Sequence, residues 1–372
     1  MKIGIDGRAA NWYRGTGIGT YTYQLISSLN NIDNINDYLI FLPDSSSLKD
    51  LKDNFNIQSV KANIKENFWD EVSVPNLLNN NIQLYHVPQN GVGLSPNISC
   101  KKAITLHDII PLRMPETVSD KYLRIFNDEL PKLLEYCEGI ITVSEFSKED
   151  ISKDFNFPKE KIFVTPLAAE DIYFPMSKLK CKEIINKKYS INDNYILYVG
   201  GLSPRKNILG LIEAYSLINR KTRNNYKLII TGRKGQSYPK YKSRSEELGV
   251  GNDVIFTDFI PLQDLPIFYN GAEVLVYPSF YEGFGLPPLE AMACGTPVIA
   301  SNITSIPEVC ADSALLINPY DVYELSNSIE QVLTDKKLML NMMKKGLIRS
   351  MKFSWESTAL NTLAAYKSMI SS

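Results

Sequence analysis

Short apolar runs alternate with longer amphipathic stretches along the first half of the chain. The short runs are bounded by turn residues, which indicates buried strands, and the stretches between them carry apolar residues at helical spacing. This alternation predicts crossover units and a parallel sheet covered by helices on both faces. The predicted strands are Lys2–Asp6, Tyr38–Leu42, Leu84–Pro88, Ala103–His107, Ile140–Ser144 and Ile162–Pro166, and the predicted helices are Tyr21–Leu29, Lys121–Tyr136 and Lys148–Phe155.

The second half repeats the pattern after a polar stretch. Residues 168–194 are rich in Asp, Lys and Asn, include Pro175 and contain no clear strand, so a domain junction is predicted there. Beyond Leu315 the pattern is mostly helical. The predicted strands are Tyr195–Gly200, Lys227–Thr231, Val254–Phe259, Val274–Tyr277 and Val298–Ser301, and the predicted helices are Ile208–Asn219, Val322–Leu333, Lys336–Ile348 and Trp355–Met369.

Two doubly wound, Rossmann-like α/β domains account for the two series. A chain of 372 residues exceeds what a single hydrophobic core usually serves. Ligands of open α/β sheets bind beyond the carboxyl ends of the strands. We therefore expect the two domains to face a central cleft that both sets of strand ends line.

Composition narrows the class of protein. Hydrophobic residues make up 44% and charged residues 22%, which is typical of a folded soluble chain. Forty basic and 41 acidic residues leave a formal charge of −1, and like charges never form a long run, which argues against a nucleic-acid partner. The five cysteines are scattered and form no C-x-x-C pair, and no apolar run is long enough for a membrane span. A cytoplasmic protein is predicted, with peripheral contact at the inner face of the membrane as an alternative.

The stretch 281–297 carries two carboxylates around a predicted helix start. A glycine-rich loop leads from the strand Val274–Tyr277 into two prolines, which suit the first turn of a helix. The helix is predicted over Leu289–Cys294, followed by a glycine stop. Glu282 then lies on the loop and Glu290 in the first helical turn, where free N–H groups attract anions.

Two adjacent cations follow the strand Tyr195–Gly200. Arg205 and Lys206 come just before the helix predicted from Ile208, close to Gly201. A planar guanidinium and a point charge suit the oxygens of a diphosphate. A solvated basic turn is the plainer alternative.

A glycine-rich stretch near the amino terminus precedes the helix predicted from Tyr21. Gly15, Gly17 and Gly19 occupy alternate positions, so backbone amides there can approach a phosphate or a sugar. The G-x-G-x-G spacing differs from a dinucleotide-binding fingerprint. A loop without any ligand is an equal alternative.

Histidine is rare in this chain. His107 ends one predicted strand and His86 lies within another, and the sequence contains no further histidine. For either residue, the simpler interpretation is a buried histidine with a structural role. His107, at a strand end, is the better candidate for a site.

Several absent motifs restrict the chemistry. The sequence has no zinc-ligand spacing, no P-loop, no G-x-S-x-G elbow and no Asp-x-Asp pair. No metal site or cofactor is therefore expected. If a diphosphate binds, cationic side chains and helix amino termini must offset its charge.

Taken in order, these motifs resemble the retaining glycosyltransferases of family 4, which have the GT-B fold and an E-x7-E signature. The signature is matched by Glu282 and Glu290, and the resemblance extends over essentially the whole chain. Its other parts are the glycines at 15–21, His107-Asp108, Val143–Ser147 and Gly201–Asn207. The amino-acid sequences of these motifs are similar to those of bacterial mannosyltransferases of surface-polysaccharide assembly.

The resemblance implies a role for each motif. Arg205 and Lys206 would bind the donor diphosphate, Glu282 the hydroxyls of the transferred sugar, and Glu290 the ribose. His107 would lie near the reacting sugar as a catalytic residue together with Glu282, Arg205 and Lys206. The family separates its arginine and lysine in sequence, whereas here they are adjacent, so their division of the phosphate contacts stays open. The remaining implied donor contacts are Gly17, Gly19, Gly201, Gly283, Phe284, Gly285 and Leu286.

The implied reaction is a retaining transfer of a hexosyl group, with mannosyl favoured, from a nucleoside diphosphate sugar to a hydroxyl. GDP-mannose is the favoured donor and a UDP-sugar the alternative; the acceptor would be a saccharide or a lipid-linked saccharide. Neither a metal nor another cofactor is implied, and the departing phosphate is the hypothetical base. An acceptor-side domain of residues 1–170 plus 356–372 and a donor-binding domain of 171–355 would follow. A sugar-nucleotide epimerase or phosphorylase of the same architecture, or a non-catalytic sugar-nucleotide-binding subunit, are the alternatives.

Overall fold

The computed structural model describes residues 1–43, 48, 50–60, 81–94 and 98–371, and they form two compact units. Unit 1 comprises Met1–Leu167 and Ser354–Ser372, and unit 2 comprises Ala168–Phe353. The sequence predicts the junctions after residues 170 and 355. The last helix thus returns to the unit in which the chain begins.

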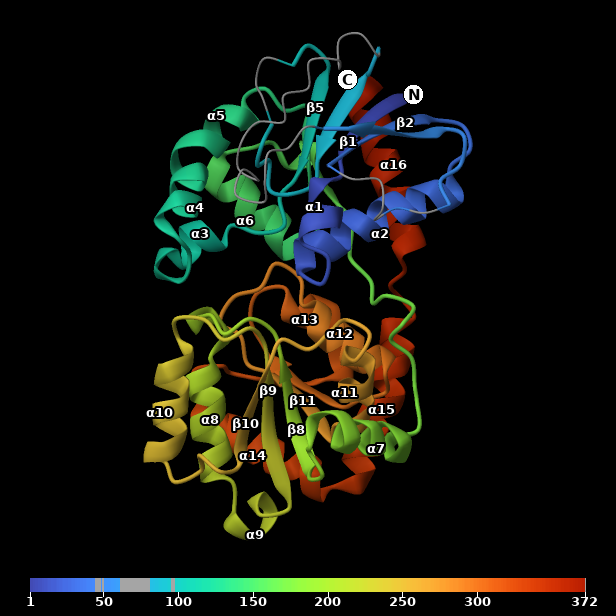
Figure 1. The fold of residues 1–372 in the computed structure, drawn as a ribbon. Coiled ribbons are helices and arrows are strands. Elements are labelled where there is room, and N and C mark those ends of the chain that lie inside the picture. The colour runs from blue at the N-terminus through green and yellow to red at the C-terminus, as the bar shows by residue number, and fades with distance from the viewer. Residues whose placement is uncertain (44–47, 49, 61–80, 95–97, 372) are drawn as a thin grey trace. The chain divides into compact units, whose positions relative to one another are not determined.

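Unit 1 is built on a seven-stranded sheet of parallel strands in the order β3-β2-β1-β4-β5-β6-β7 (Figure 1). The order reverses direction between β1 and β4, which is the mark of a doubly wound sheet. The central strands are buried on both faces, as their nearly continuous apolar sequences require. The strands are β1 Lys2–Asp6, β2 Asp37–Leu42, β3 Phe55–Ser59, β4 Leu84–Val87, β5 Lys101–Thr105, β6 Gly139–Thr142 and β7 Ile162–Val164.

Helices cover both faces of this sheet. In Figure 1, α2 and α16 lie on one side, and α3 to α6 lie on the other. The predicted helix Lys121–Tyr136 is observed as α4, a π-helical stretch Ile125–Glu129 and α5 in succession. The helices are α1 Arg8–Trp12, α2 Gly17–Ile32, α3 Ile110–Arg113, α4 Asp120–Arg124, α5 Leu130–Leu134, α6 Glu145–Phe155 and α16 Trp355–Ser371, with 3-10 turns at Pro115–Thr117 and Lys159–Lys161.

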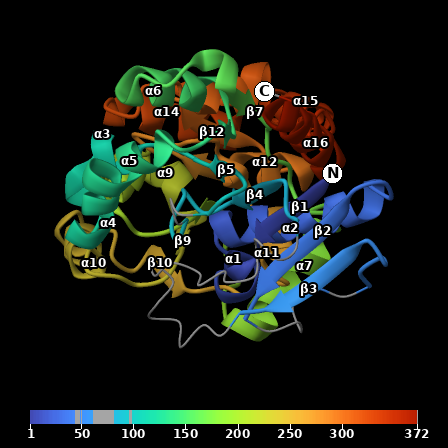
Figure 2. The ribbon, with the colours of Figure 1, turned by 90° about the horizontal axis from the view of Figure 1, so that it is seen from above.

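Helix α16 is fixed to unit 1 by buried polar contacts as well as by apolar packing. It lies beside α2, as both views show (Figure 2). The Tyr366 hydroxyl is 2.7 Å from Nδ1 of His86, and Nε2 of His86 is 2.8 Å from the hydroxyl of Thr105. The Thr105 hydroxyl is also 2.8 Å from the Tyr21 hydroxyl of α2. All four side chains are buried, so the contacts satisfy polar atoms that water cannot reach. His86 therefore has a structural role.

Unit 2 is built on a six-stranded parallel sheet in the order β10-β9-β8-β11-β12-β13. Here the order reverses between β8 and β11. Strands β8 and β11 are flanked on both sides by other strands, and their side chains are almost entirely buried. The strands are β8 Asn194–Val199, β9 Tyr226–Thr231, β10 Val254–Asp258, β11 Val274–Tyr277, β12 Val298–Ser301 and β13 Leu315–Ile317.

The helices of unit 2 also form a layer on each face of their sheet. Figure 1 shows α8, α10 and α14 on one face and α7, α11, α12 and α15 on the other. The helices are α7 Lys178–Tyr189, α8 Ile208–Leu217, α9 Arg220–Arg223, α10 Tyr238–Glu247, α11 Leu265–Gly271, α12 Leu286–Ala293, α13 Ile306–Cys310, α14 Val322–Thr334 and α15 Lys336–Ser350, with 3-10 turns at Pro204–Lys206 and Ala311–Ser313. Within the described part of the chain, no helix has both the length and the apolar character needed to span a bilayer.

The predicted fold class, two doubly wound α/β units, is confirmed, and every predicted strand is present to within a few residues. Strands β3 and β13 were not predicted. Strand β3 carries only two apolar residues, and β13 is apolar but only three residues long. Each is an edge strand, which needs an apolar surface on fewer sides. The cleft between the units remains a prediction.

We expect Tyr366→Phe to lower the free energy of unfolding by about 1–3 kcal/mol, because a buried nitrogen of His86 loses its partner. Urea unfolding followed by circular dichroism measures the change. Tyr323→Phe is the matched control, since Tyr323 is 71% exposed. Equal stability of the two variants would contradict the role given to this contact.

Candidate active site

The loops that follow β8 and β11 meet at the point where the strand order of unit 2 reverses. In open α/β sheets this point, beyond the carboxyl ends of the strands, is the usual ligand position. Residues 200–207 leave β8 and residues 278–285 leave β11. The amide of Phe280 donates to the carbonyl of Arg205 at 2.8 Å, so the backbones of the two loops are joined directly.

A 3-10 turn presents the two cations of the first loop. The turn spans Pro204–Lys206 and ends at Asn207, whose φ of 56° is left-handed, a conformation that asparagine tolerates well. The Asn207 side chain then caps α8 by accepting from the amide of Gly210 at 3.2 Å. The sharp change of direction at Asn207 leaves Arg205 and Lys206 on the turn instead of in the helix.

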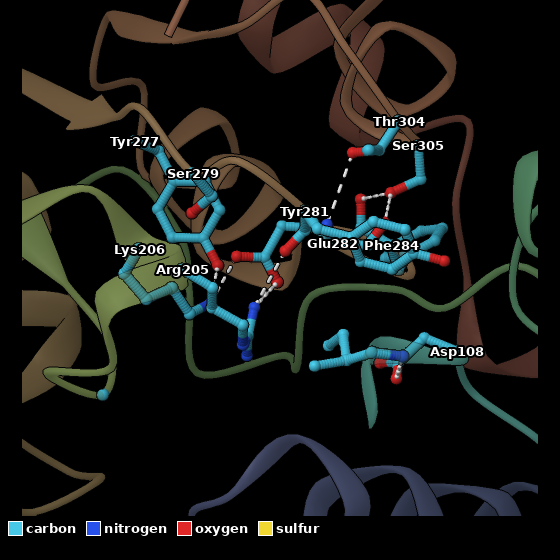
Figure 3. A network of polar contacts seen from close by, with 12 residues as sticks. Asp108, Arg205, Lys206, Tyr277, Ser279, Tyr281, Glu282, Phe284, Thr304 and Ser305 are labelled. Carbon is cyan, nitrogen blue, oxygen red and sulfur yellow. Dashed lines mark hydrogen bonds and ion pairs between the residues drawn. The ribbon is translucent and has the colours of Figure 1, made fainter. Parts of the chain in front are cut away.

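Glu282 lies between these two cations (Figure 3). Its Oε2 is 2.9 Å from Nη1 of Arg205, and its Oε1 is 2.5 Å from Nζ of Lys206. Nζ of Lys206 also donates to the Tyr277 hydroxyl at 2.6 Å, and Nη1 of Arg205 donates to the carbonyl of Tyr281 at 2.9 Å. The structure therefore brings together three of the predicted site residues.

The cations keep the buried Glu282 carboxylate ionised. Glu282 is 6% exposed and Lys206 7% exposed. Burial alone would raise the pKa of Glu282, but the charges of Arg205 and Lys206 lower that pKa to about 2. A carboxylate with such a pKa is a poor proton acceptor at neutral pH, and it holds both cations in place.

Helix α12 begins earlier than predicted. It starts at Leu286, directly after Gly285, and includes both prolines in its first turn. Gly285 has a φ of 115°, and a Cβ there would lie 2.6 Å from the side chain of Ile306, so glycine is required at this position. The helix therefore starts three residues before the predicted start at Leu289. Glu290 consequently lies in the second turn, and its predicted place in the first turn was wrong.

Glu290 has an environment unlike that of Glu282. Its Oε2 accepts from the Tyr269 hydroxyl at 2.6 Å, and the side chain is half-buried. Burial raises the pKa of Glu290 to about 7, and the negative charge of Glu170 contributes to the increase. Glu290 is thus partly protonated at neutral pH, when it can both donate and accept hydrogen bonds.

The structure gives its own reasons for glycine at positions near the amino terminus. Gly17 and Gly19 lie in the first turn of α2, not in a loop before it, which corrects the prediction. The amide of Gly19 donates to the hydroxyl of Thr16, the helix cap, at 3.2 Å. A Cβ on Gly19 would lie 1.9 Å from the carbonyl oxygen of Tyr13, so the backbone passes too closely for any other residue.

His107 is buried two residues beyond the end of β5, so it does not end the strand as predicted. Its Nε2 donates to the carbonyl oxygen of Pro88 at 3.0 Å, and its ring meets the edge of the Tyr21 ring at a centroid distance of 4.8 Å. Burial lowers the pKa of His107 to about 4. His107 is therefore neutral at pH 7, with Nδ1 as its unprotonated nitrogen.

Several polar residues at strand ends were not predicted as site residues. Tyr277 was predicted only as the last residue of a strand, and Thr304 and Ser305 follow β12 and contact the Glu282 loop. In unit 1, Asp6 at the end of β1 and Arg8 at the start of α1 form a buried ion pair of 2.7 Å. Their one signal in the sequence is position, since all follow or end a predicted strand.

The fold agrees with that of known proteins. A family model described as Glycosyl transferases group 1 matches residues 182–348. The O-antigen chain mannosyltransferase B of Escherichia coli is 38% identical over 284 residues, which cover 76% of this chain and 74% of that protein.

The structure of sucrose-phosphate synthase from Thermosynechococcus elongatus matches 100% of this chain and 99% of its own, with a TM-score of 0.79 and 21% identity. The structure of Anabaena Alr3699/HepE in complex with UDP and glucose matches 99% of this chain and 100% of its own, with a TM-score of 0.76 and 19% identity. These structural likenesses show the GT-B fold.

The opposite pKa shifts of the two glutamates predict opposite dependences of stability on pH. The pKa of Glu290 rises from 4.5 to about 7 on folding, so its protonated form stabilises the fold fully below pH 4.5 and this contribution is lost as pH rises through 7. Relative to the wild type, we expect Glu290→Gln to gain roughly 1–3 kcal/mol of unfolding free energy between pH 5 and pH 8. Urea titrations at both pH values measure the gain.

Glu282→Gln is the matched control of opposite sign. The pKa of Glu282 falls from 4.5 to about 2 on folding, so its ionised form stabilises the fold above pH 4.5, and this stability is lost as pH falls toward 2. The deficit of Glu282→Gln should therefore be larger at pH 6 than at pH 3. Parallel pH profiles for the two variants would contradict the assigned environments.

Proposed function

Since this chain belongs to the glycosyl transferases group 1 family, we propose that it transfers a mannosyl group from GDP-mannose to a hydroxyl of a surface polysaccharide, with retention of anomeric configuration. Its 38% identity to an O-antigen chain mannosyltransferase supports the sugar and the acceptor class. A UDP-sugar is the alternative donor, supported by the UDP bound in the Anabaena structure. The observation on which the proposal rests is the cluster of Arg205, Lys206 and Glu282 at the switch point of unit 2.

Arg205 and Lys206 would stabilise the leaving group. Cleavage of the glycosidic bond to the donor leaves additional negative charge on the departing diphosphate, and fixed cations lower the energy of that state. Both cations are anchored before any donor arrives, Lys206 by Tyr277 and Arg205 by the carbonyl of Tyr281. Little reorganisation is then needed during the reaction. Gly201, on the same loop, leaves space for the phosphates because a Cβ there would meet no atom within 4 Å.

Glu282 would bind the transferred sugar as an ionised acceptor. Its low pKa favours hydrogen bonds from sugar hydroxyls and disfavours the role of general base. The backbone amides of Gly283, Phe284 and Gly285 and the first turn of α12 at Leu286 would contribute donors beside it. We assign the removal of the acceptor proton to the departing phosphate.

Glu290 would bind the ribose hydroxyls of the donor. It is paired with the Tyr269 hydroxyl, which fixes the orientation of its carboxyl group. Two vicinal hydroxyls can both donate to the oxygens of such a carboxyl group. The roles expected for His107, Gly17 and Gly19, which all belong to unit 1, stay predictions.

The proposed reaction needs no essential metal, because Arg205 and Lys206 are positioned to offset the diphosphate charge. We propose a cytoplasmic location, with contact at the inner membrane face when the acceptor is lipid-linked. The five free cysteines support a reducing compartment.

A single assay tests the proposal. The purified protein is incubated with GDP-mannose and a mannose-terminated oligosaccharide, and the product is examined by proton NMR of the new anomeric centre. We expect an α-linked product, in equal amounts with and without EDTA. A β-linked product would refute retention of anomeric configuration. Loss of product in EDTA would refute metal independence, and product from UDP-sugars alone would refute GDP-mannose as the donor. Conversion of the donor without acceptor would favour an epimerase.

Loss of one anchored cation should slow turnover strongly. We expect Lys206→Ala to lower kcat by roughly 10² or more, since one preorganised charge-stabilising group is removed. Steady-state kinetics measure the change. Lys242→Ala is the control because that side chain is 59% exposed and forms an ion pair with Glu246 of its own helix. A folded Lys206→Ala enzyme with near-normal kcat would rule out the leaving-group role.

A further inference from the structure

Two consecutive hydroxyl residues between β12 and α13 hold the backbone of the Glu282 loop. The amide of Glu282 donates to Oγ1 of Thr304 at 3.3 Å (Figure 3). Oγ of Ser305 lies 2.8 Å from the carbonyl oxygen of Glu282 and 2.9 Å from that of Phe284. We call Thr304 and Ser305 the hydroxyl clasp. The clasp therefore bonds both the amide and the carbonyl of the residue whose side chain pairs with Arg205 and Lys206.

The side chain of Ser305 does not cap α13, although Ser305 occupies the N-cap position of that helix. It directly precedes α13, where a serine side chain usually accepts from the helix's own amides, but its side chain makes no such bond. Ser305 is fully buried, and its hydroxyl is directed to the carbonyls of the Glu282 loop instead. The single hydroxyl proton is shared between two acceptors, which places them close together and fixes the curvature of the loop.

Thr304 is held in a conformation that its side chain disfavours. Its φ of 58° lies in the left-handed region, which is an outlier for a β-branched residue. Strain of this kind persists only when surrounding contacts fix it, and it concentrates at functional sites. Glycine would relieve the strain but would remove the oxygen that accepts from Glu282. Threonine at this position therefore keeps the contact with the loop at the expense of backbone strain.

We propose that Thr304 and Ser305 are positioning residues for glycosyl transfer. They fix the backbone of Glu282 so that its carboxylate meets Arg205 and Lys206 and the amides of the following glycine-rich loop keep one arrangement. This inference rests on the proposed function, and it adds two residues that act through the backbone of the Glu282 loop. Small displacements of a reacting group cost large factors in rate, so the clasp affects kcat more than donor affinity.

Variants of Thr304 separate positioning from general stability. We expect Thr304→Gly to lower kcat about tenfold or more, with KM for the donor changed by less than about threefold and Tm within a few degrees of the wild type, because relief of strain offsets the lost bond. Thr304→Ser keeps the hydroxyl and should retain kcat to within about threefold. Ser305→Ala should lower kcat in the same way as Thr304→Gly.

Ala311→Gly is the matched control for backbone strain. Ala311 also has a positive φ, of 49°, and it lies at the other end of α13. Its replacement should raise or preserve Tm and leave kcat unchanged. If kcat of Thr304→Gly and Ser305→Ala equals that of the wild type, or falls only with the fraction of folded protein, the clasp has no positioning role.

A double-mutant cycle tests whether the clasp acts through Glu282. In a Glu282→Gln background, Thr304→Gly should lower kcat by less than about twofold further, since the carboxylate it positions is already lost. Full additivity of the two effects would overturn the inference. A wild-type enzyme inactive with every donor would instead refute the proposed function, so the two failures are distinguishable.

Discussion

One buried carboxylate paired with two cations determines how the carboxyl ends of β8 and β11 are arranged. Glu282 lies within 2.5 Å of Nζ of Lys206 and 2.9 Å of Nη1 of Arg205. Burial of the Glu282 carboxylate is tolerated because both cations pair with it, and loss of Glu282 would deprive two cations of this partner. The pairing also joins the loop that follows β8 to the loop that follows β11. The same pairing keeps two cations ready at the switch point of the sheet.

The two glutamates of the E-x7-E pattern differ because their surroundings differ. Glu282 lies between cations and is ionised, whereas Glu290 is held by Tyr269 near Glu170 and has a raised pKa. Two carboxylates with separated pKa values are suited to different tasks. The loop after β11 thus presents a fixed negative group among cations, and α12 presents a carboxyl group with a raised pKa.

Periodicity sufficed to predict both parallel sheets, since buried strands have continuous apolar runs and helices have a different period. The same reasoning located Glu282 and its neighbouring cations on strand-end loops. It did not show that they touch, because Lys206 and Glu282 are 76 residues apart and no local pattern encodes that contact. Thr304 was missed since hydroxyl residues are common in loops. The steric constraint on Gly19 could not be predicted, because its close approach to the carbonyl oxygen of Tyr13 is visible only in three dimensions.

In the proposed reaction, Arg205 and Lys206 receive the departing diphosphate of a nucleotide sugar while Glu282 holds them in place. A crystal structure of the protein with bound GDP is the sharpest test of this arrangement. We expect phosphate oxygens within about 3 Å of the guanidinium of Arg205 and the ammonium of Lys206, a typical distance for charge-assisted hydrogen bonds. A nucleotide whose phosphates bind elsewhere, with the ion pairs of Glu282 untouched, would contradict it.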